Sequence, residues 1–333
     1  MSELRDLVQA LPKTDTHSRD VATERQKLLT KPAGSLGRLE DIAIWLASWQ
    51  GRAAPLLDKC QTIVFAGNHG VAARGVSAFP PTVTEQMVAN FRRGGAAINQ
   101  LCQNVGSDLD VHQLKLDHPT QDFSIAPAMS DDDCIAAINV GIEAVRPDSD
   151  LIALGEMGIG NTTTAAAVCC GLYGGDPSLW VGRGTGINDA SLALKAGLIR
   201  DALALHGRRL DDPTNVISHL GGRELAAILG ATLSARYQRI PVLLDGFVCT
   251  AAAAPLAAIS NNALDHCLVG HSSVEPGHAR LMGELDKTAL VDLNMRLGEA
   301  SGAALAIGIV KAAAAVHNGM ATFAEAGVSE KQE

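Results

Sequence analysis

The chain has 333 residues, of which 47% are apolar, so it can bury a large core as one α/β domain with additions or as two closely joined domains. Its net charge is −9 at pH 7 and it contains no Lys/Arg block, which argues against nucleic acid and anionic membranes as partners. Seven cysteines without framework spacing, no signal-like N-terminal segment and no uncharged run long enough to span a bilayer lead us to expect a cytoplasmic protein with reduced thiols.

The first 52 residues are expected to be helical. Charged residues recur at helical spacing over residues 19–29, and apolar residues repeat on one face over residues 36–49. The turn between them reads KPAGSLGR, with Pro32 expected to end the first helix. Lys31 and Arg38 of this turn could reach an anion, but solvated surface charges are the more common outcome.

A buried strand is predicted over residues 62–66, followed by the glycine-rich segment GNHGV. His69 comes just after this strand, where open α/β sheets place their ligands, and it is a candidate substrate-binding residue. The alternative, a hydrogen-bonded structural histidine, is the more common role. A helix is expected over residues 83–99, with a possible second start after the glycines at 94 and 95, and a strand over residues 109–116.

The central stretch, residues 148–168, predicts a strand, a loop and a helix. The apolar run 151–154 leads into a loop with three glycines and then into capping residues before an alanine-rich helix. Glycines let the backbone approach a ligand, and the first amides of the helix favour an anion such as phosphate. Glu156 in this loop would repel an anion, so we expect it to face a neutral or cationic part of the substrate. An ordinary turn without a ligand is the alternative.

A second glycine cluster, residues 182–186, resembles part of a dinucleotide fingerprint. Its Gly-x-Gly-x-Gly spacing differs from Gly-x-Gly-x-x-Gly, and no long strand precedes it. We therefore interpret it as a second phosphate-facing loop, since Lys195 on the following helix can supply a positive charge.

Two further strands, residues 240–244 and 267–270, are expected in the second half, each followed by a helix. His271, Glu275 and His278 follow the second strand, but the histidines are seven residues apart across a proline-bearing loop, unlike a zincin, so no metal is expected. Glu299 stands beside glycines where the last long helix, residues 303–317, begins. A first-turn glutamate favoured by the helix dipole is the alternative to a functional role.

The alternation of strands and helices predicts a three-layer α/β/α fold around a mostly parallel, Rossmann-like sheet. Residues 1–55 together with 300–333 are expected to form a small helical domain, and residues 56–299 the large domain. Because the glycine-rich segments follow strands or precede helices, they should meet at one edge of the sheet and form a single site.

Five motifs together are similar to those of the nicotinate-nucleotide:5,6-dimethylbenzimidazole phosphoribosyltransferase family. They are KPAGSLGR (31–38), NHGV (68–71), GEMGIGNTT (155–163), PVLLDGF (241–247) and RLGEASG (296–302). The likeness extends from about residue 10 to 320. It implies a cytoplasmic homodimer that makes α-ribazole 5′-phosphate and nicotinate from nicotinate mononucleotide and 5,6-dimethylbenzimidazole, without a cofactor or a metal, in cobalamin assembly.

The resemblance also implies roles for individual residues. It places the general base at Glu299 and the phosphate-binding backbone at Met157, Gly158, Ile159, Arg183, Gly184, Arg296, Leu297 and Gly298. Lys195, Glu156 and Ser273 are expected in the same cavity, with the benzimidazole pocket near Phe79 and Met87. Some relatives carry polar residues at these last two positions, so the preferred base stays open.

Two other functions remain as alternatives. A dinucleotide-dependent oxidoreductase would use the glycine loops, but it needs an acidic residue about 20 positions after the fingerprint, and none is well placed after Gly182. A non-catalytic nucleotide or benzimidazole sensor would bind the same ligands without releasing nicotinate. A carboxylate among three candidate phosphate loops favours chemistry over sensing.

Overall fold

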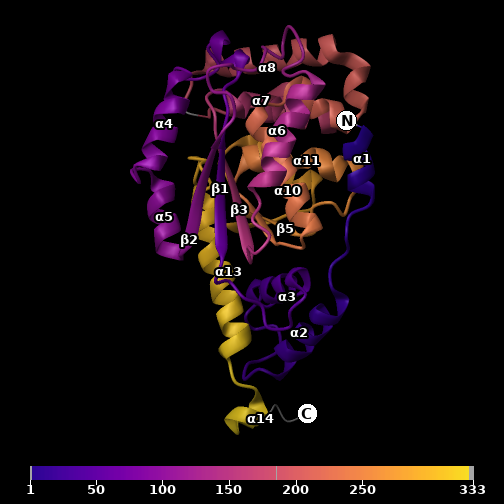
Figure 1. The fold of residues 1–333 in the computed structure, drawn as a ribbon, viewed down its shortest axis with the longest axis vertical. Coiled ribbons are helices and arrows are strands. Elements are labelled where there is room, and N and C mark those ends of the chain that lie inside the picture. Colours follow the sequence, from indigo (N-terminus) through magenta and orange to yellow (C-terminus); the bar gives the residue numbers. More distant parts are fainter. Residues whose placement is uncertain (1, 185, 330–333) are drawn as a thin grey trace.

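The computed structural model describes residues 2–184 and 186–329, which are built around one six-stranded sheet (Figure 1). The strand order is β2-β1-β3-β4-β5-β6, and every neighbouring pair is parallel. The strands are β1 (Cys60–Ala66), β2 (Ser107–Gln113), β3 (Leu151–Met157), β4 (Val242–Leu244), β5 (Cys267–His271) and β6 (Ala289–Val291). The predicted α/β class with a parallel sheet is therefore confirmed.

The helices connect the strands and cover the sheet. In chain order they are α1 (Ser2–Gln9), α2 (Thr16–Leu28), α3 (Arg38–Gln50), η1 (Gly70–Arg74), α4 (Thr82–Arg92), α5 (Ala97–Val105), α6 (Asp131–Ala144), α7 (Asn161–Tyr173), η2 (Pro177–Leu179), α8 (Asp189–His206), η3 (Gly207–Asp211), α9 (Pro213–Leu220), α10 (Arg223–Tyr237), α11 (Phe247–Ile259), α12 (Pro276–Glu284), α13 (Ser301–Gly319) and α14 (Phe323–Ala326). The helix expected over residues 83–99 is thus two helices, separated by a turn at Gly94.

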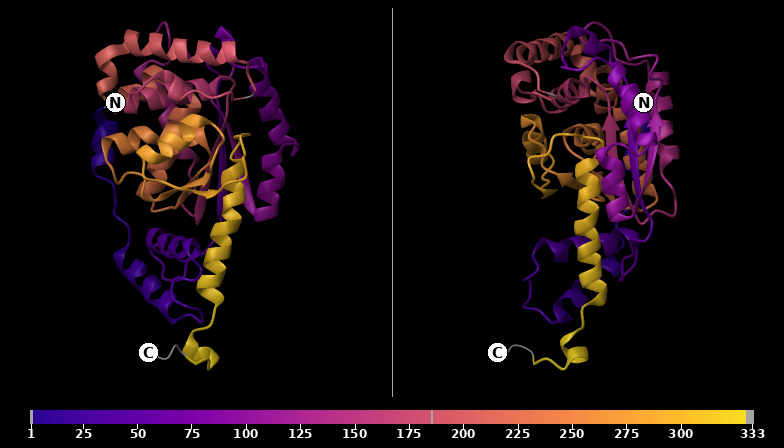
Figure 2. Two further views of the ribbon diagram at one scale, coloured as in Figure 1. Left: turned by 180° about the vertical axis from the view of Figure 1, so that it is seen from behind. Right: turned by 90° about the vertical axis from the view of Figure 1, so that its left-hand side faces the viewer.

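The strands are apolar because helices cover the sheet on both faces. Alternate residues along β3 divide between two cores: Ile152 and Leu154 pack with residues of α6, α7, α10 and α11, whereas Leu151 and Ala153 pack with residues of α3 and α13. Views from behind and from the side show these helix layers against the sheet (Figure 2). This arrangement is the predicted three-layer architecture.

Strand β3 is longer than predicted. Its pairing with β1 continues through Phe65 with Glu156 and Ala66 with Met157, so Glu156 belongs to the strand and not to the loop after it. The prediction was wrong here because a glycine at position 155 interrupts the apolar run. Strand β6 was not predicted, since three partly exposed residues carry no clear periodicity.

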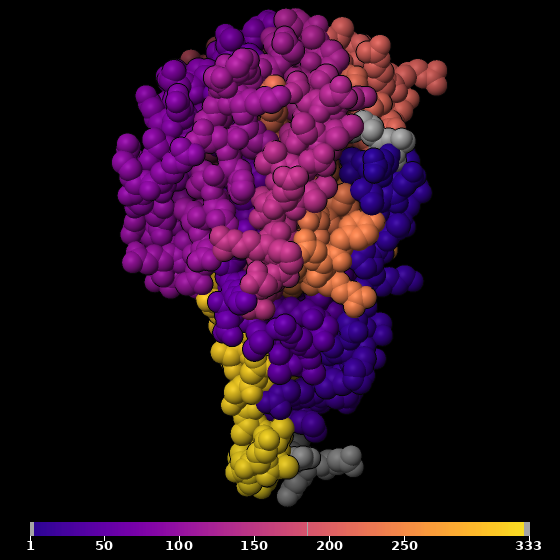
Figure 3. All heavy atoms as spheres, in the orientation of Figure 1, coloured from indigo at the N-terminus to yellow at the C-terminus, as the bar shows by residue number. Residues whose placement is uncertain are grey.

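Helices α2 and α3 pack together at the end of the molecule reached by the C-terminal half of α13, and both views show α13 extending well past the sheet (Figures 1 and 2). In the space-filling view α13 and these N-terminal helices form the narrow lower part (Figure 3). Helix α1 lies elsewhere and contacts α9 and α11. The division into a small and a large domain stays a prediction.

Both basic side chains of the KPAGSLGR turn, Lys31 and Arg38, make polar contacts within the protein. Lys31 is buried and its Nζ forms an ion pair with Glu40 Oε1 at 2.8 Å. Arg38 donates to the carbonyls of Thr288 and Ala289 at 3.2 and 2.6 Å, so it holds the segment that leads into β6. The expectation of a solvated charge was wrong for Lys31, because its partner comes from a neighbouring helix, whereas Arg38 is exposed to solvent as expected while it donates to carbonyls 250 and 251 positions away.

Among the described residues, α13 is the one helix with the length and apolar composition to cross a membrane. Half of that stretch is buried inside the protein, and core helices commonly have the same composition. We regard this as weak evidence for a membrane span.

Candidate active site

A cavity of about 380 Å³ opens at the carboxyl ends of the strands. Segments that are far apart in the sequence meet there, as predicted from their positions after strands or before helices, but the glycine-rich segment 67–71 does not line the cavity. It is lined by Phe79, Val83, Met87, Glu156, Met157, Gly158, Ile159, Asn161, Thr162, Gly184, Asp245, Gly246, Phe247, Val248, His271, Ser273, Glu275, Arg296, Leu297, Gly298 and Glu299.

Glu299 is held on the cavity wall by an unusual backbone. Glu299 and Ala300 have φ values of +61° and +63°, a left-handed conformation that costs a non-glycine residue roughly 1 kcal/mol or more. The Glu299 N–H donates to the Glu156 carbonyl at 3.2 Å, which ties this turn to the end of β3. The side chain is only 5% exposed. The turn therefore fixes the carboxylate in the cavity immediately before α13 begins.

Three carboxylates gather at this point: Glu156, Asp245 and Glu299. Burial raises the pKa of Glu299 to about 7, and the charge of Asp245 adds to this effect. Burial, together with the charges of Asp245 and other nearby acids, raises the pKa of Glu156 well above its usual range. Burial likewise raises the pKa of Asp245. A helix start lowers the pKa of a nearby acid, but here burial outweighs that effect, and Glu299 titrates near neutral pH.

Asp245 and Glu156 are oriented by hydrogen bonds. Asp245 Oδ1 accepts from the Ala303 N–H at 2.9 Å and lies 3.5 Å from His271 Nε2. The Asn161 side chain donates to Glu156 Oε2. Both acids therefore line the cavity with Glu299 in orientations that these contacts fix.

The first glycine-rich loop brings the backbone of residues 157–159 to the cavity, at the start of α7. Gly160 precedes α7 with φ +96°. A Cβ on Gly158 would lie 2.7 Å from the Gly67 carbonyl oxygen, so a larger residue would displace the loop. The Ile159 N–H already donates to Thr84 Oγ1 at 3.2 Å. The phosphate-binding role expected for this backbone stays a prediction, and one of its amides, that of Ile159, is already engaged by a hydroxyl.

His69 is not brought to the cavity. It is 2% exposed, shares a 2.5 Å hydrogen bond with Glu224 and lies 3.2 Å from Thr164 Oγ1. This pair packs behind Gly158, where a Cβ would meet His69 Nε2 at 3.2 Å. These contacts are those of a hydrogen-bonded structural histidine, the alternative to a substrate-binding role.

The second glycine cluster follows η2 and not a strand, so it lacks the context of a dinucleotide fingerprint. Gly184 lines the main cavity and an adjoining one of about 390 Å³, whereas Arg183 lines only the latter and pairs with Asp189. The Gly184 carbonyl accepts from Arg296 at 3.2 Å. The predicted phosphate residues of two loops are thus joined to each other.

Lys195 of α8 lies beneath this second loop. Its Nζ donates to Thr162 Oγ1 at 3.0 Å and to the Gly182 carbonyl at 3.2 Å. Burial lowers the pKa of Lys195 to about 8. Lys195 does not line the main cavity, but a Cβ on Gly184 would be 3.3 Å from its Nζ, so its charge is close to the loop.

An apolar wall completes the site. Phe79, Val83 and Met87 come from α4 and the turn before it, and Phe247 and Val248 come from the start of α11. Phe79 is 51% exposed and therefore reaches the solvent. Ser273 lines the same cavity. A flat aromatic ligand fits such a wall.

Sequence reasoning missed Asn161 and Asp245 of the site and Glu224 behind it, and it considered His271 and Glu275 only as metal ligands. Asp245 directly follows β4, and His271 is the last residue of β5, so the rule that places ligands at the carboxyl ends of strands could have identified both. The partner of His69 could not be found in this way, since Glu224 is 155 residues away in the chain. Among the described residues, no group of three or more His, Cys, Asp or Glu side chains could hold a metal ion.

Comparison with known proteins gives consistent matches over nearly the whole chain. Residues 11–328 match a family model described as a phosphoribosyltransferase. A protein of Ruegeria sp. (strain TM1040) named nicotinate-nucleotide–dimethylbenzimidazole phosphoribosyltransferase is 57% identical over 99% of this chain and 98% of its own length. A protein of the same name from Mesorhizobium japonicum is also 57% identical, over 99% and 98%. The crystal structure of CobT from Thermus thermophilus superimposes with a TM-score of 0.89 at 40% identity, covering 95% of this chain and 100% of that one.

Proposed function

Because the chain belongs to the family of nicotinate-nucleotide:dimethylbenzimidazole phosphoribosyltransferases, we propose that it transfers the phosphoribosyl group of nicotinate mononucleotide to 5,6-dimethylbenzimidazole. The products are nicotinate and α-ribazole 5′-phosphate, the nucleotide of the lower ligand of cobalamin. The enzyme works as a cytoplasmic homodimer on these small molecules. The family establishes the phosphoribosyltransferase class, whereas the substrates, the products and the course of the reaction are proposed.

The observation that carries the proposal is the buried carboxylate of Glu299. It faces the cavity, and its pKa of about 7 makes it a usable base near neutral pH. Benzimidazole is a poor nucleophile while its ring N–H is retained. A carboxylate that accepts this proton as the other ring nitrogen attacks C1′ lowers the barrier of the step.

The reaction proceeds by displacement at C1′. Nicotinate is attached through a cationic pyridinium nitrogen and leaves with the bonding electron pair as a neutral ring. The incoming base attacks from the opposite face, which converts a β-nucleotide into an α-nucleotide. The transition state has oxocarbenium character, so positioning of the ribose supplies much of the rate gain.

The backbone of residues 157–159 and 296–298 holds the 5′-phosphate in this proposal, which requires the Ile159 N–H to exchange Thr84 Oγ1 for a phosphate oxygen. These residues belong to two loops that line one cavity, and one of the loops precedes a helix N-terminus. Lys195 and Arg296 add positive charge near the same loops. The apolar wall at Phe79 and Met87 receives the benzimidazole, which places its N–H toward Glu299.

The test is to mix the purified protein with nicotinate mononucleotide and a panel of benzimidazoles, purines and phenols. Mass spectrometry detects the nucleotide product, and NMR gives the configuration at C1′. The proposal predicts nicotinate release and an α-linked product with 5,6-dimethylbenzimidazole. Stoichiometric binding without nicotinate release would favour the sensor, and binding of dinucleotides alone would favour the oxidoreductase.

A further inference from the structure

Glu275 is a buried acid of the site without an assigned role. It lies immediately before Pro276, the first residue of α12, is only 6% exposed and lines both adjoining cavities. Its Oε1 accepts from the Gly184 N–H at 2.8 Å. Its Oε2 is buried and has no hydrogen-bond partner among the described residues. One oxygen of this carboxylate is therefore fixed by the second glycine loop, and the other lacks a donor.

The position of Glu275 is fixed by close packing. A Cβ on Gly182 would lie only 2.1 Å from Glu275 Oε2, so the carboxylate lies directly against the loop backbone. The Lys195 ammonium nearby donates to the Gly182 carbonyl and to Thr162, and it forms no direct ion pair with the acid. A buried carboxylate oxygen without a donor is unfavourable, and a bound ligand is the natural source of one.

The groups of the two proposed substrates differ in whether they can donate a hydrogen bond to Glu275. The phosphate and the carboxylate of nicotinate mononucleotide only accept hydrogen bonds, and the single N–H of the benzimidazole is assigned to Glu299. The remaining donors are the ribose hydroxyls. Acidic side chains bind ribose hydroxyls in this way in other nucleotide sites.

We propose, on the premise of the function above, that Glu275 accepts a hydrogen bond from a ribose hydroxyl of the nucleotide and so selects ribonucleotides over deoxyribonucleotides. The Gly184 amide orients the carboxylate for this contact. While Glu275 holds that amide, Gly184 does not donate it to the phosphate, which is then bound by the amides of the other two loops. Glu275 is thus a specificity residue and takes no part in proton transfer.

The experiment compares nicotinate mononucleotide with its 2′-deoxy and 3′-deoxy analogues as substrates of the wild type and Glu275→Gln. The amide keeps an acceptor oxygen for Gly184 but removes the charge. The wild type should prefer the ribonucleotide over one deoxy analogue by at least about tenfold in kcat/KM, and Glu275→Gln should lower the ribonucleotide value by about tenfold or more, because hydrogen bonds to charged groups are the strong ones. The kcat/KM for that deoxy analogue should differ less than about twofold between the wild type and Glu275→Gln, since the analogue lacks the hydroxyl that contacts Glu275.

Glu284→Gln, the same change at the other end of α12 and outside the main cavity, is the matched control and should leave all three kcat/KM values unchanged. Equal losses for all three substrates with Glu275→Gln would overturn the inference and indicate a role in loop structure only. Tighter binding of all three substrates and of inorganic phosphate would also overturn it, because Glu275 would then occupy the phosphate position. Turnover of nicotinate mononucleotide by the wild type tests the proposed function separately.

Discussion

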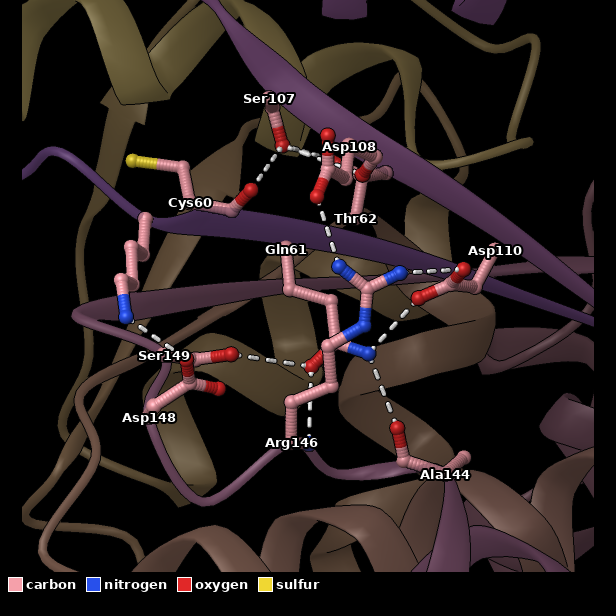
Figure 4. Close-up of polar contacts among 11 residues, drawn as sticks. Cys60, Gln61, Thr62, Ser107, Asp108, Asp110, Ala144, Arg146, Asp148 and Ser149 are labelled. Carbon is pink, nitrogen blue, oxygen red and sulfur yellow. Dashed lines mark hydrogen bonds and ion pairs between the residues drawn. The ribbon is translucent and has the colours of Figure 1, made fainter.

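Charged side chains form ion pairs at one end of the β-sheet, whereas acids at the other end are buried without a lysine or arginine partner in the part of the chain that the structure describes. At the amino ends of the strands, Arg146 joins Asp108 and Asp110 at 2.6 and 2.7 Å, and Lys59 pairs with Asp148 at 2.7 Å (Figure 4). At the carboxyl ends, the acids around the cavity are buried, and within the described residues none of Glu156, Asp245 and Glu299 pairs with lysine or arginine.

The pKa values follow this difference. Hydrogen bonding to Lys59 lowers the pKa of Asp148, and hydrogen bonding to Asp108 raises the pKa of Arg146, so these groups stay charged. Burial raises the pKa of Glu299 to about 7 instead. Paired charges hold the loops below the strands in place. Buried acids without a lysine or arginine partner can exchange protons with a ligand, and such perturbed groups concentrate at functional sites.

The largest effect is expected from removing the basicity of Glu299. Glu299→Gln keeps the shape of the side chain but cannot accept the proton, so kcat should fall by at least about a hundredfold. The KM for nicotinate mononucleotide should change little, because the phosphate amides are untouched. Steady-state kinetics with 5,6-dimethylbenzimidazole measures both values, and unchanged turnover would remove Glu299 from the mechanism.

The same substitution should stabilise the protein above neutral pH. The folded-state pKa of about 7 lies above the ordinary value of 4.5, so the folded protein holds a proton that the unfolded chain has released between these values. The contribution of Glu299 to stability therefore falls as pH rises from about 4.5 to 7 and is constant above that. At pH 8, Glu299→Gln should raise the free energy of unfolding by at most about 3 kcal/mol.

Urea unfolding of both proteins at pH 4.5 and pH 8 measures this effect. The two midpoints should nearly coincide at the lower pH and separate at the higher one. A constant difference at both pH values would mean that Glu299 does not titrate differently in the folded state.

A bulkier residue under the Glu299 turn should disturb it. A Cβ on Gly155 would lie 2.2 Å from the Ala300 nitrogen, so Gly155→Ala must push the turn away from β3. We expect a loss of about 1–3 kcal/mol of stability, as for other overpacked cores, together with reduced turnover. Gly283→Ala, where no atom lies within 4 Å of the new Cβ, is the matched control for urea unfolding and kinetics. Equal behaviour of the two variants would contradict the close packing of the turn.

The smallest effect is expected at the other end of the sheet. Arg146 is partly exposed, and exposed ion pairs contribute little, so Arg146→Met should cost about 1 kcal/mol or less. Turnover should be unchanged, because the residue is far from the carboxyl ends of the strands. A substantial loss of kcat with intact stability would show that the two ends are coupled.

The sequence predicted the elements that depend on local pattern. Buried strands β1 and β3 are apolar runs, and the site was expected where such strands end. Three-residue β6 was missed, and Glu156 was assigned to a loop, because strand pairing across the sheet extends β3 beyond its apolar run. The ends of such strands are decided by hydrogen bonding to neighbouring strands, which the local sequence pattern does not reveal.

The buried polar partners could not be predicted. Lys31 finds Glu40 on the next helix, and Glu275 finds the Gly184 amide 91 residues earlier in the chain. Two phosphate loops were interpreted from their glycines and the neighbouring helix starts, whereas the base role of Glu299 and the phosphate role of residues 296–298 came from a family resemblance. The pKa of Glu299 depends on burial and on Asp245, which only the folded arrangement provides.

The pH dependence of kcat with saturating substrates tests the role of Glu299 most directly. The wild type should lose activity by about tenfold per pH unit below an apparent pKa near 7 and reach a plateau above it, because only the carboxylate accepts the proton. Glu299→Gln should show a low rate without this inflection. An inflection near 7 that persists in Glu299→Gln would contradict the account, since another group would then be the base.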